Sequence, residues 1–162
     1  MPTTRRSAEK TLKILVADDT RANREILRVF LEKGGHTVIL AGDGREAVER
    51  FAAENPDLVI MDVMMPVMDG FEATRQIKAR TADRWVPVIF LSALDKDQNI
   101  VEGLESGGDD YLAKPINFVV LEAKIQSFAR TLQLQSSLEE QRQEMAAVSA
   151  NVADGLAAID RD

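Results

Sequence analysis

The sequence contains no cysteine, which excludes disulfide bonds, thiolate catalysis and zinc sites built on thiolates. It also lacks any apolar run long enough to cross a bilayer. The first ten residues include Arg5, Arg6 and Lys10 but no apolar stretch, so we expect no signal peptide. These absences favour a cytoplasmic protein that does not insert into a membrane.

Positive charge is scarce as well. The 162 residues include 20 Lys and Arg against 27 Asp and Glu, giving a formal net charge of -7. Such a balance argues against nucleic-acid binding by this segment. The single histidine, His36, is interpreted as a satisfied surface or boundary residue and not as a phosphotransfer histidine. The length suits one domain with a core plus an appendage.

Short apolar runs alternate with helical patterns along the chain. The predicted strands are Lys13–Ala17, Thr37–Ala41, Leu58–Met61, Val88–Leu91 and Tyr111–Ala113. The predicted helices are Arg21–Lys33, Gly44–Glu54, Asp69–Arg80, Asp97–Ser106 and a last helix capped by Asn117. This alternation predicts an α/β fold with a doubly wound parallel sheet. The flavodoxin-like strand order 2-1-3-4-5 places its switch point between strands one and three.

The last helical pattern runs beyond the expected domain, because no Pro or Gly interrupts it from Asn117 to Asp154. The predicted helix would be about 55 Å long. Apolar residues recur every seven positions at Leu138, Met145, Val152 and Ile159, but their would-be partner positions are Arg142, Ser149 and Leu156. The heptad is therefore imperfect. A dimeric coiled coil is favoured over a single fraying helix, since polar single helices are marginal in water.

Three carboxylates follow two of the predicted strands. Asp18 and Asp19 come after Lys13–Ala17, and Asp62 comes after Leu58–Met61. Because the carboxyl ends of parallel strands meet at one edge, these side chains should converge there. Two like charges about 4 Å apart cost roughly 4 kcal/mol at an effective dielectric near 20. The pattern thus predicts a compensating cation, either Mg²⁺ with oxygen ligands or the ammonium of Lys114.

Within this cluster, Asp62 is the candidate nucleophile, since a carboxylate attacks phosphorus to form an acyl phosphate. Asp19 would bind Mg²⁺ directly and Asp18 partly through water, and the backbone carbonyl of Met64 would complete the site. The alternative for the aspartate pair is helix N-capping. Capping explains one of the two aspartates and not a consecutive pair that faces a third.

A hydroxyl and an ammonium are predicted at the same edge, because Ser92 and Lys114 end the fourth and fifth strands. Both groups suit a new phosphoryl group. The alternatives are a turn or cap residue for Ser92 and a solvated surface residue for Lys114. The Lys114–Pro115 bond is of the type that adopts cis at modest cost.

These residues and their order resemble the receiver domain of two-component response regulators, over about residues 12–132. The resemblance is carried by Asp18-Asp19, Asp62-Val63-Met64-Met65-Pro66-Val67-Met68-Asp69-Gly70, Ser92 and Lys114-Pro115. It implies that Asp62 is the phosphoacceptor, that Asp18 and Asp19 hold Mg²⁺, and that Lys114 contacts the phosphoryl group. It also implies a hydroxyl switch at Ser92 and an aromatic switch at Tyr111.

The resemblance further implies a histidine kinase or phosphotransfer protein as donor, and no enzyme activity beyond the chain's own phosphorylation and dephosphorylation. The state would be transmitted by the surface of Asp97–Ser106, Tyr111–Ala113 and the last helix, with a homodimer through that surface or the helix. Two positions set the phosphoryl lifetime in this family, and here they are Met64 and Leu94. Because both are apolar, slow self-dephosphorylation is the hypothesis.

Two alternative functions agree less well with the sequence. An aspartate-nucleophile phosphatase would carry a D-x-D pattern after the first strand, whereas this chain has Asp18-Asp19-Thr20. A degenerate receiver acting as a dimerisation scaffold would lose its acidic residues, and here they are intact.

The sequence predicts a flexible tail (1–11), a receiver domain (12–132) and a helical linker toward an output domain (133–162). Residues 151–162 resemble the entry to a PAS sensory domain, which favours a fragment of a longer regulator over a stand-alone receiver with a helical tail.

Overall fold

The computed structural model describes residues 11–81, 83–93 and 97–160, with side chains described except at 97–99 and 146–160. The chain forms two compact units, one being Thr11–Lys124 and the other including the last helix from Ile125 onward. No helix among the described residues is both long and apolar enough to cross a membrane.

The first unit is built on a five-stranded parallel sheet. Its strands are β1 (Lys13–Ala17), β2 (Thr37–Ala41), β3 (Leu58–Asp62), β4 (Val88–Ser92) and β5 (Asp110–Ala113). The helices are α2 (Arg21–Lys33), α3 (Gly44–Glu54), α4 (Gly70–Ala79), α5 (Asp97–Glu105) and α6 (Phe118–Asp160). The spatial order is β2-β1-β3-β4-β5, and every adjacent pair is parallel. The predicted flavodoxin-like fold is confirmed.

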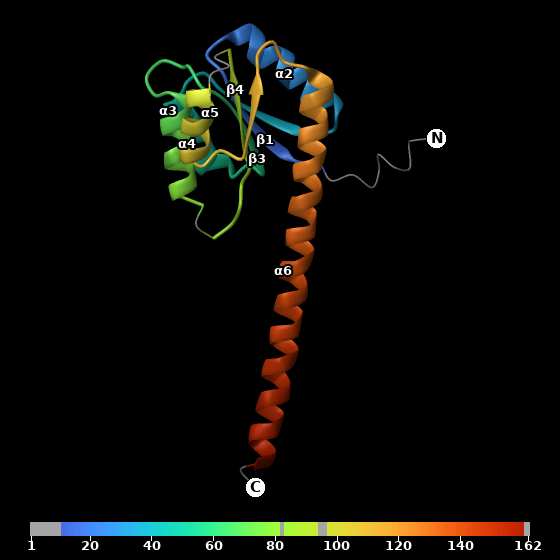
Figure 1. Ribbon diagram of the computed structural model, residues 1–162. Helices are drawn as coiled ribbons and strands as arrows, with labels where there is room; N and C mark the ends of the chain where they lie inside the picture. Colours follow the sequence, from blue (N-terminus) through green and yellow to red (C-terminus); the bar gives the residue numbers. More distant parts are fainter. Residues whose placement is uncertain (1–10, 82, 94–96, 161–162) are drawn as a thin grey trace, which may run out of the picture. The chain divides into compact units, whose positions relative to one another are not determined.

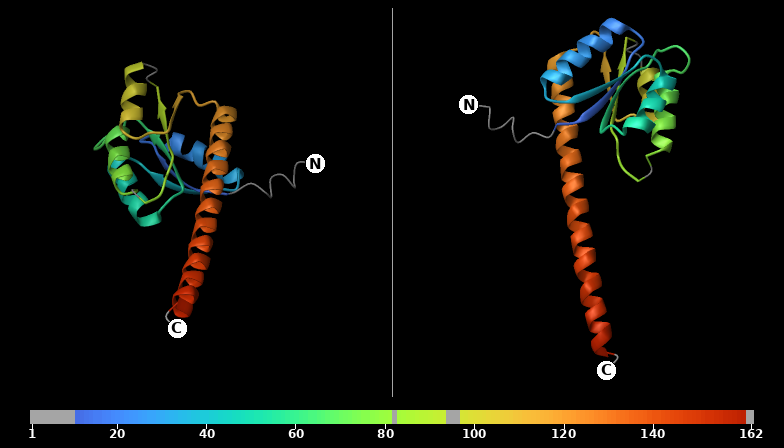
Figure 2. Two further views of the ribbon diagram at one scale, coloured as in Figure 1. Left: turned by 60° about the horizontal axis from the view of Figure 1, so that its bottom comes forward. Right: turned by 180° about the vertical axis from the view of Figure 1, so that it is seen from behind.

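Helices cover both faces of this sheet. In Figures 1 and 2, α3, α4 and α5 lie on one side, and α2 and the beginning of α6 lie on the other. The ring centroids of Phe30 on α2 and Phe118 on α6 are 4.9 Å apart, which fixes the beginning of α6 beside α2. All residues of β3 and β4 are buried. This two-sided burial explains why these strands read as continuous apolar runs without alternation.

The helix ends agree with the capping signals in the sequence. Asp69 caps α4 by accepting a hydrogen bond from the Glu72 N–H at 2.8 Å, which is the bond from an N-cap side chain to the third helical N–H. Asn117 Oδ1 accepts from the N–H groups of Val119 and Val120 at the start of α6. Three predicted strands are one residue too short, because Asp62 and Ser92 end β3 and β4 and Asp110 begins β5. Backbone hydrogen bonds to the neighbouring strand, and not the apolar character of the side chains, decide the bounds of a strand.

The helix α6 is longer than the sequence pattern indicated. It continues through Gly155 to Asp160 and has 43 residues, a length of about 64 Å. A glycine inside a helix costs only about 1 kcal/mol relative to alanine. Gly155 was therefore a weaker stop signal than Gly34 and Gly35, which end α2 with Gly35 at φ 92°.

Candidate functional site

Three carboxylates converge at the carboxyl edge of the sheet. Residues Ala17 and Met61 are register partners in the parallel β1–β3 pair, so the residues that follow them come side by side. Carboxylate oxygens of Asp18, Asp19 and Asp62 lie within 4.8 Å of one another. Asp18 is fully buried and Asp62 is 5% exposed, whereas Asp19 is exposed. The cluster thus has two buried carboxylates and one that faces solvent.

A lysine from the last strand enters this cluster. The Lys114 N–H donates to the Ser92 carbonyl at 2.8 Å, which carries the β4–β5 pairing one residue past β5. The Lys114 Nζ lies 3.2 Å from Asp18 Oδ2 and 3.3 Å from Asp62 Oδ2. The Lys114–Pro115 peptide bond is cis. Lys114 is therefore a partner of two buried carboxylates and not a solvated surface residue.

Burial and charge oppose each other at Asp62. Burial, together with the negative charge of Asp18, raises the pKa of Asp62 to about 6 despite the ammonium of Lys114 and a hydrogen bond from the Met64 backbone N–H. Burial also acts to lower the pKa of Lys114, but the charges of Asp62 and Asp18 outweigh it and the net pKa is raised. At pH 7 the lysine is charged and Asp62 is mostly ionised.

The loop after β1 holds Asp18 through both its side chain and its backbone. Asp18 Oδ1 accepts from the Thr20 N–H at 2.8 Å, and Arg24 Nη1 donates to the Asp18 carbonyl oxygen at 2.7 Å. Thr20, and neither aspartate, is the N-cap of α2, and it makes no side-chain capping bond. The helix-capping alternative therefore does not describe the pair. Sequence reasoning missed Arg24, whose signal is a long basic side chain on the first turn of the helix after the acidic pair.

The loop after β3 and the end of β3 pass too close to the first residues of α3 and α4 for any side chain there, and both of these residues are glycines. A Cβ on Gly70 would lie 2.2 Å from the Asp62 carbonyl oxygen, and one on Gly44 would lie 2.2 Å from the Met68 carbonyl oxygen. The Gly70 N–H donates to the Val63 carbonyl at 2.8 Å. Only glycine permits such approaches. The start of α4 is thereby fixed against the strand that ends in Asp62.

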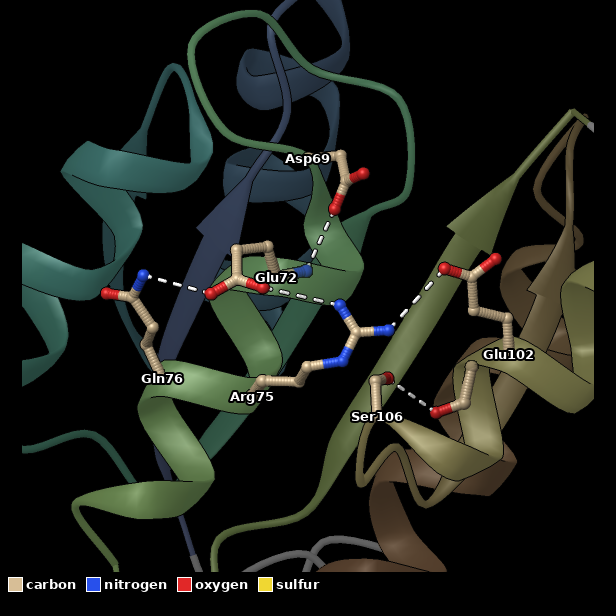
Figure 3. A network of polar contacts seen from close by, with 7 residues as sticks. Asp69, Glu72, Arg75, Gln76, Glu102 and Ser106 are labelled. Carbon is tan, nitrogen blue, oxygen red and sulfur yellow. Dashed lines mark hydrogen bonds and ion pairs between the residues drawn. The ribbon is translucent and has the colours of Figure 1, made fainter.

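An ion network joins this part of α4 to α5. Arg75 Nη1 lies 3.4 Å from Glu72 Oε1, and Arg75 Nη2 lies 3.5 Å from Glu102 Oε2. Figure 3 shows Arg75 between these two glutamates, with Asp69 capping the start of α4 above them. These side chains are nearly half exposed, so each pair contributes at most about 1 kcal/mol. The network therefore links α4 to α5 at the protein surface and adds little to the stability of the fold.

The remaining predicted residues occupy distinct surroundings. Ser92 is 1% exposed and is the register partner of Ala113, while Tyr111 is half-buried against the core. Met64 is 63% exposed beside Asp62. Leu94 lies outside the described residues. The structure thus brings Ser92, Lys114 and the three aspartates to the same edge of the sheet.

The donor set fits a hard divalent cation. Three carboxylates and one ammonium leave two uncompensated negative charges around a group of oxygens within 4.8 Å. Hard cations such as Mg²⁺ take carboxylate oxygens and keep water ligands. The exposed Asp19 leaves the solvent side open for those waters.

Comparison with known proteins agrees with this geometry. The family model "Response regulator receiver domain" matches residues 14–126, and the chain belongs to this family. It is 43% identical over 125 residues to the response regulator MprA of Mycobacterium ulcerans (strain Agy99), covering 77% of this chain and 53% of that protein. The chain spans about half the length of the curated relatives it matches.

Solved structures show the same relationship. The receiver domain of the Francisella response regulator 1452 has a TM-score of 0.69 and 35% identity, covering 75% of this chain and 98% of that one. A Saccharomyces cerevisiae structure of the histidine phosphotransfer protein Ypd1 with the receiver domain of Ssk1 has a TM-score of 0.69 and 30% identity. The match covers 75% of this chain and 91% of that one. The chain contains a receiver domain of a two-component response regulator.

Proposed function

We propose that this chain is a phosphorylation-dependent signalling module in which Asp62 accepts a phosphoryl group from a histidine kinase or a phosphotransfer protein. The observation that carries the proposal is the pairing of Lys114 Nζ with the buried carboxylates of Asp18 and Asp62, at 3.2 and 3.3 Å, with the exposed Asp19 beside them. The co-crystal structure of Ypd1 with the receiver domain of Ssk1 supports a histidine phosphotransfer protein as one class of donor.

The transfer is a displacement at phosphorus. An oxygen of the Asp62 carboxylate attacks the phosphorus of a phosphohistidine, the P–N bond breaks, and the donor imidazole leaves with the bonding electron pair. Asp62 must be ionised to attack, and its pKa of about 6 meets this condition at neutral pH. Lys114, already beside Asp62, offers an ammonium to the incoming phosphoryl oxygens.

Mg²⁺ is the proposed cofactor. Asp18, Asp19, Asp62 and the backbone carbonyl of Met64 would hold it, and when bound it would neutralise charge on the phosphoryl oxygens. In the proposed division of roles, Arg24 and the Thr20 N–H keep Asp18 oriented toward the site.

Readout of the phosphoryl group is assigned to Ser92 and Tyr111. The buried hydroxyl of Ser92 would be drawn toward the new phosphoryl group, and Tyr111 on the neighbouring strand would follow it. The affected surface consists of α5, β5 and the beginning of α6. A bistable element biased by a new charge is the physical basis of such switches.

Beyond the receiver unit, we propose that α6 carries the state toward an output module and that the chain acts as a homodimer in the cytoplasm. The partition into a tail (1–11), a receiver (12–132) and a helical linker (133–162) is part of this proposal. The apolar side chains at Met64 and Leu94 offer no group that orients a hydrolytic water, so the phosphoryl group should persist.

The test is labelling with radioactive acetyl phosphate in the presence and absence of Mg²⁺. We expect label on the wild-type chain only with Mg²⁺, and none on Asp62→Asn. The matched control is Asp57→Asn, whose carboxylate instead accepts a hydrogen bond from the Lys13 N–H at the start of β1, and it should label like wild type. Undiminished labelling of Asp62→Asn would overturn the assignment.

A further inference from the structure

Exposed apolar side chains form a narrow stripe along α6 within the second unit. Leu134, Leu138 and Met145 are 65%, 60% and 70% exposed. At 3.6 residues per turn they fall within about 40° of the helix circumference. Exposed large apolar residues confined to one stripe of a helix differ from the scattered ones that every protein surface carries.

The stripe has the spacing of a coiled-coil seam. Steps of four and three from Leu134 define one continuous a/d register along the helix, which runs to Ile159. Its successive positions are Leu134, Leu138, Gln141, Met145, Val148 and Val152. The partner positions are thus Leu134, Gln141 and Val148, and not Arg142, Ser149 and Leu156 as the sequence pattern first suggested. In this register the heptads are apolar except for Gln141 and the glycine at 155.

From this register, we infer that α6 pairs with α6 of a second copy of this chain as a parallel two-stranded coiled coil, with Gln141 opposite Gln141. A seam along one helix is complementary to itself under twofold symmetry, so a second copy is the partner that it fits. A polar helix of this kind also needs a partner to stay helical in water.

The polar layer decides the direction. In a parallel pair, the two Gln141 amides meet, and each offers both a donor and an acceptor to the other. In a fully overlapped antiparallel pair running from Leu134 to Ile159, Gln141 would face Val152 and its amide would be buried without a partner. A single Asn or Lys at an a position specifies register in parallel coiled coils, and Gln141 places a comparable polar layer at a d position.

The flanking charges do not oppose the parallel arrangement. The positions that approach one another across a parallel seam pair Arg142 with Ser137, and Glu144 with Ser149. No two like charges face each other in either pair. Arg142 instead lies 3.7 Å from Glu139 of its own helix.

The absence of native cysteine makes disulfide mapping a direct test on the full chain. We expect Gln141→Cys to cross-link to itself under mild oxidation, because facing positions lie within the 7 Å Cα separation that a disulfide requires. In the antiparallel pair the two residues at 141 would be about 16 Å apart, and only the double variant Gln141→Cys, Val152→Cys would cross-link. Gln143→Cys, on the opposite side of the helix, is the matched control and should stay reduced.

Sedimentation gives the independent readout. Leu138→Lys with Met145→Lys should weaken dimerisation on the order of a hundredfold, because two apolar layers are lost. Gln143→Lys should leave it unchanged. The inference would be overturned if the wild-type chain were monomeric, or if the chain with Leu138→Lys and Met145→Lys still dimerised. It would also be overturned if the Gln141→Cys chain stayed reduced while the double-cysteine chain cross-linked.

This inference refines the dimer named in the proposed function. All its measurements use the unphosphorylated chain, so they do not depend on phosphoryl transfer. Failure of Asp62 to accept a phosphoryl group would leave the cross-linking result untouched, and failure of the coiled coil would leave the labelling result untouched.

Discussion

Replacing Asp62 with Asn should stabilise the metal-free protein at neutral pH. The pKa of Asp62 is raised from 3.8 to about 6, mainly by burial. The native chain therefore binds this proton more tightly than the unfolded chain does. Between about pH 4 and pH 6 the native state holds more protons, so the wild type loses stability as pH rises through that window.

The size of the effect follows from the same values. Ionising Asp62 in the native state costs about 3 kcal/mol more than in the unfolded chain, at 1.36 kcal/mol per pKa unit. Asn carries no charge and avoids this cost, but it is a weaker hydrogen-bond acceptor for Lys114. The free energy of unfolding of Asp62→Asn should therefore exceed that of wild type by about 1–3 kcal/mol at pH 7. The difference should vanish near pH 4.

The assay is urea unfolding of both chains in EDTA between pH 4 and pH 8. Addition of Mg²⁺ should then reduce the difference in free energy of unfolding between Asp62→Asn and wild type, because an ion that binds only the native wild type stabilises it by mass action. The matched control is Asp109→Asn. Its carboxylate accepts from Lys78 Nζ, Trp85 Nε1 and the Val88 N–H, so the same chemical change should destabilise the fold by about 1–3 kcal/mol.

A pH-independent difference between wild type and Asp62→Asn would refute the reasoning, as would a less stable variant at pH 7. Either result would mean that the carboxylate is not held in an unfavourable ionised state by its surroundings.

Three further changes test other parts of the site. Lys114→Gln should destabilise the metal-free chain by about 2–4 kcal/mol, because it leaves the buried Asp18 and Asp62 without a cation; urea unfolding should show that Mg²⁺ restores more stability here than in wild type. Val67 is exposed at φ 71°, so Val67→Gly should raise the free energy of unfolding by about 1 kcal/mol. Val67→Ala, which keeps the Cβ, should raise the free energy of unfolding by a smaller amount. Met64→Glu should shorten the phosphoryl lifetime several-fold, measured as loss of label after acetyl phosphate is removed, whereas Met64→Leu should not; equal lifetimes would contradict the proposed role of this position.

Much of the fold was predictable because its signals are local. Short apolar runs, the glycine pair at 34–35, and the caps Asp69 and Asn117 each act over a few residues, and the structure uses all of them. The strand order was also predictable from the sequence, because the right-handedness of crossover connections leaves few topologies for alternating strands and helices. The strand ends at Asp62, Ser92 and Asp110 were not, because the ladder of a neighbouring strand sets them.

By itself, the sequence determined which groups this protein brings to the edge of its sheet: three carboxylates, a hydroxyl and a lysine at the ends of strands. Only the tertiary structure decided their environment. Burial of Asp18, the approach of Lys114, which lies 96 residues from Asp18 in the sequence, and the resulting pKa of Asp62 arise from packing between distant segments. Such terms depend on distance and on the exclusion of water, and neither quantity is encoded in any short stretch of the chain.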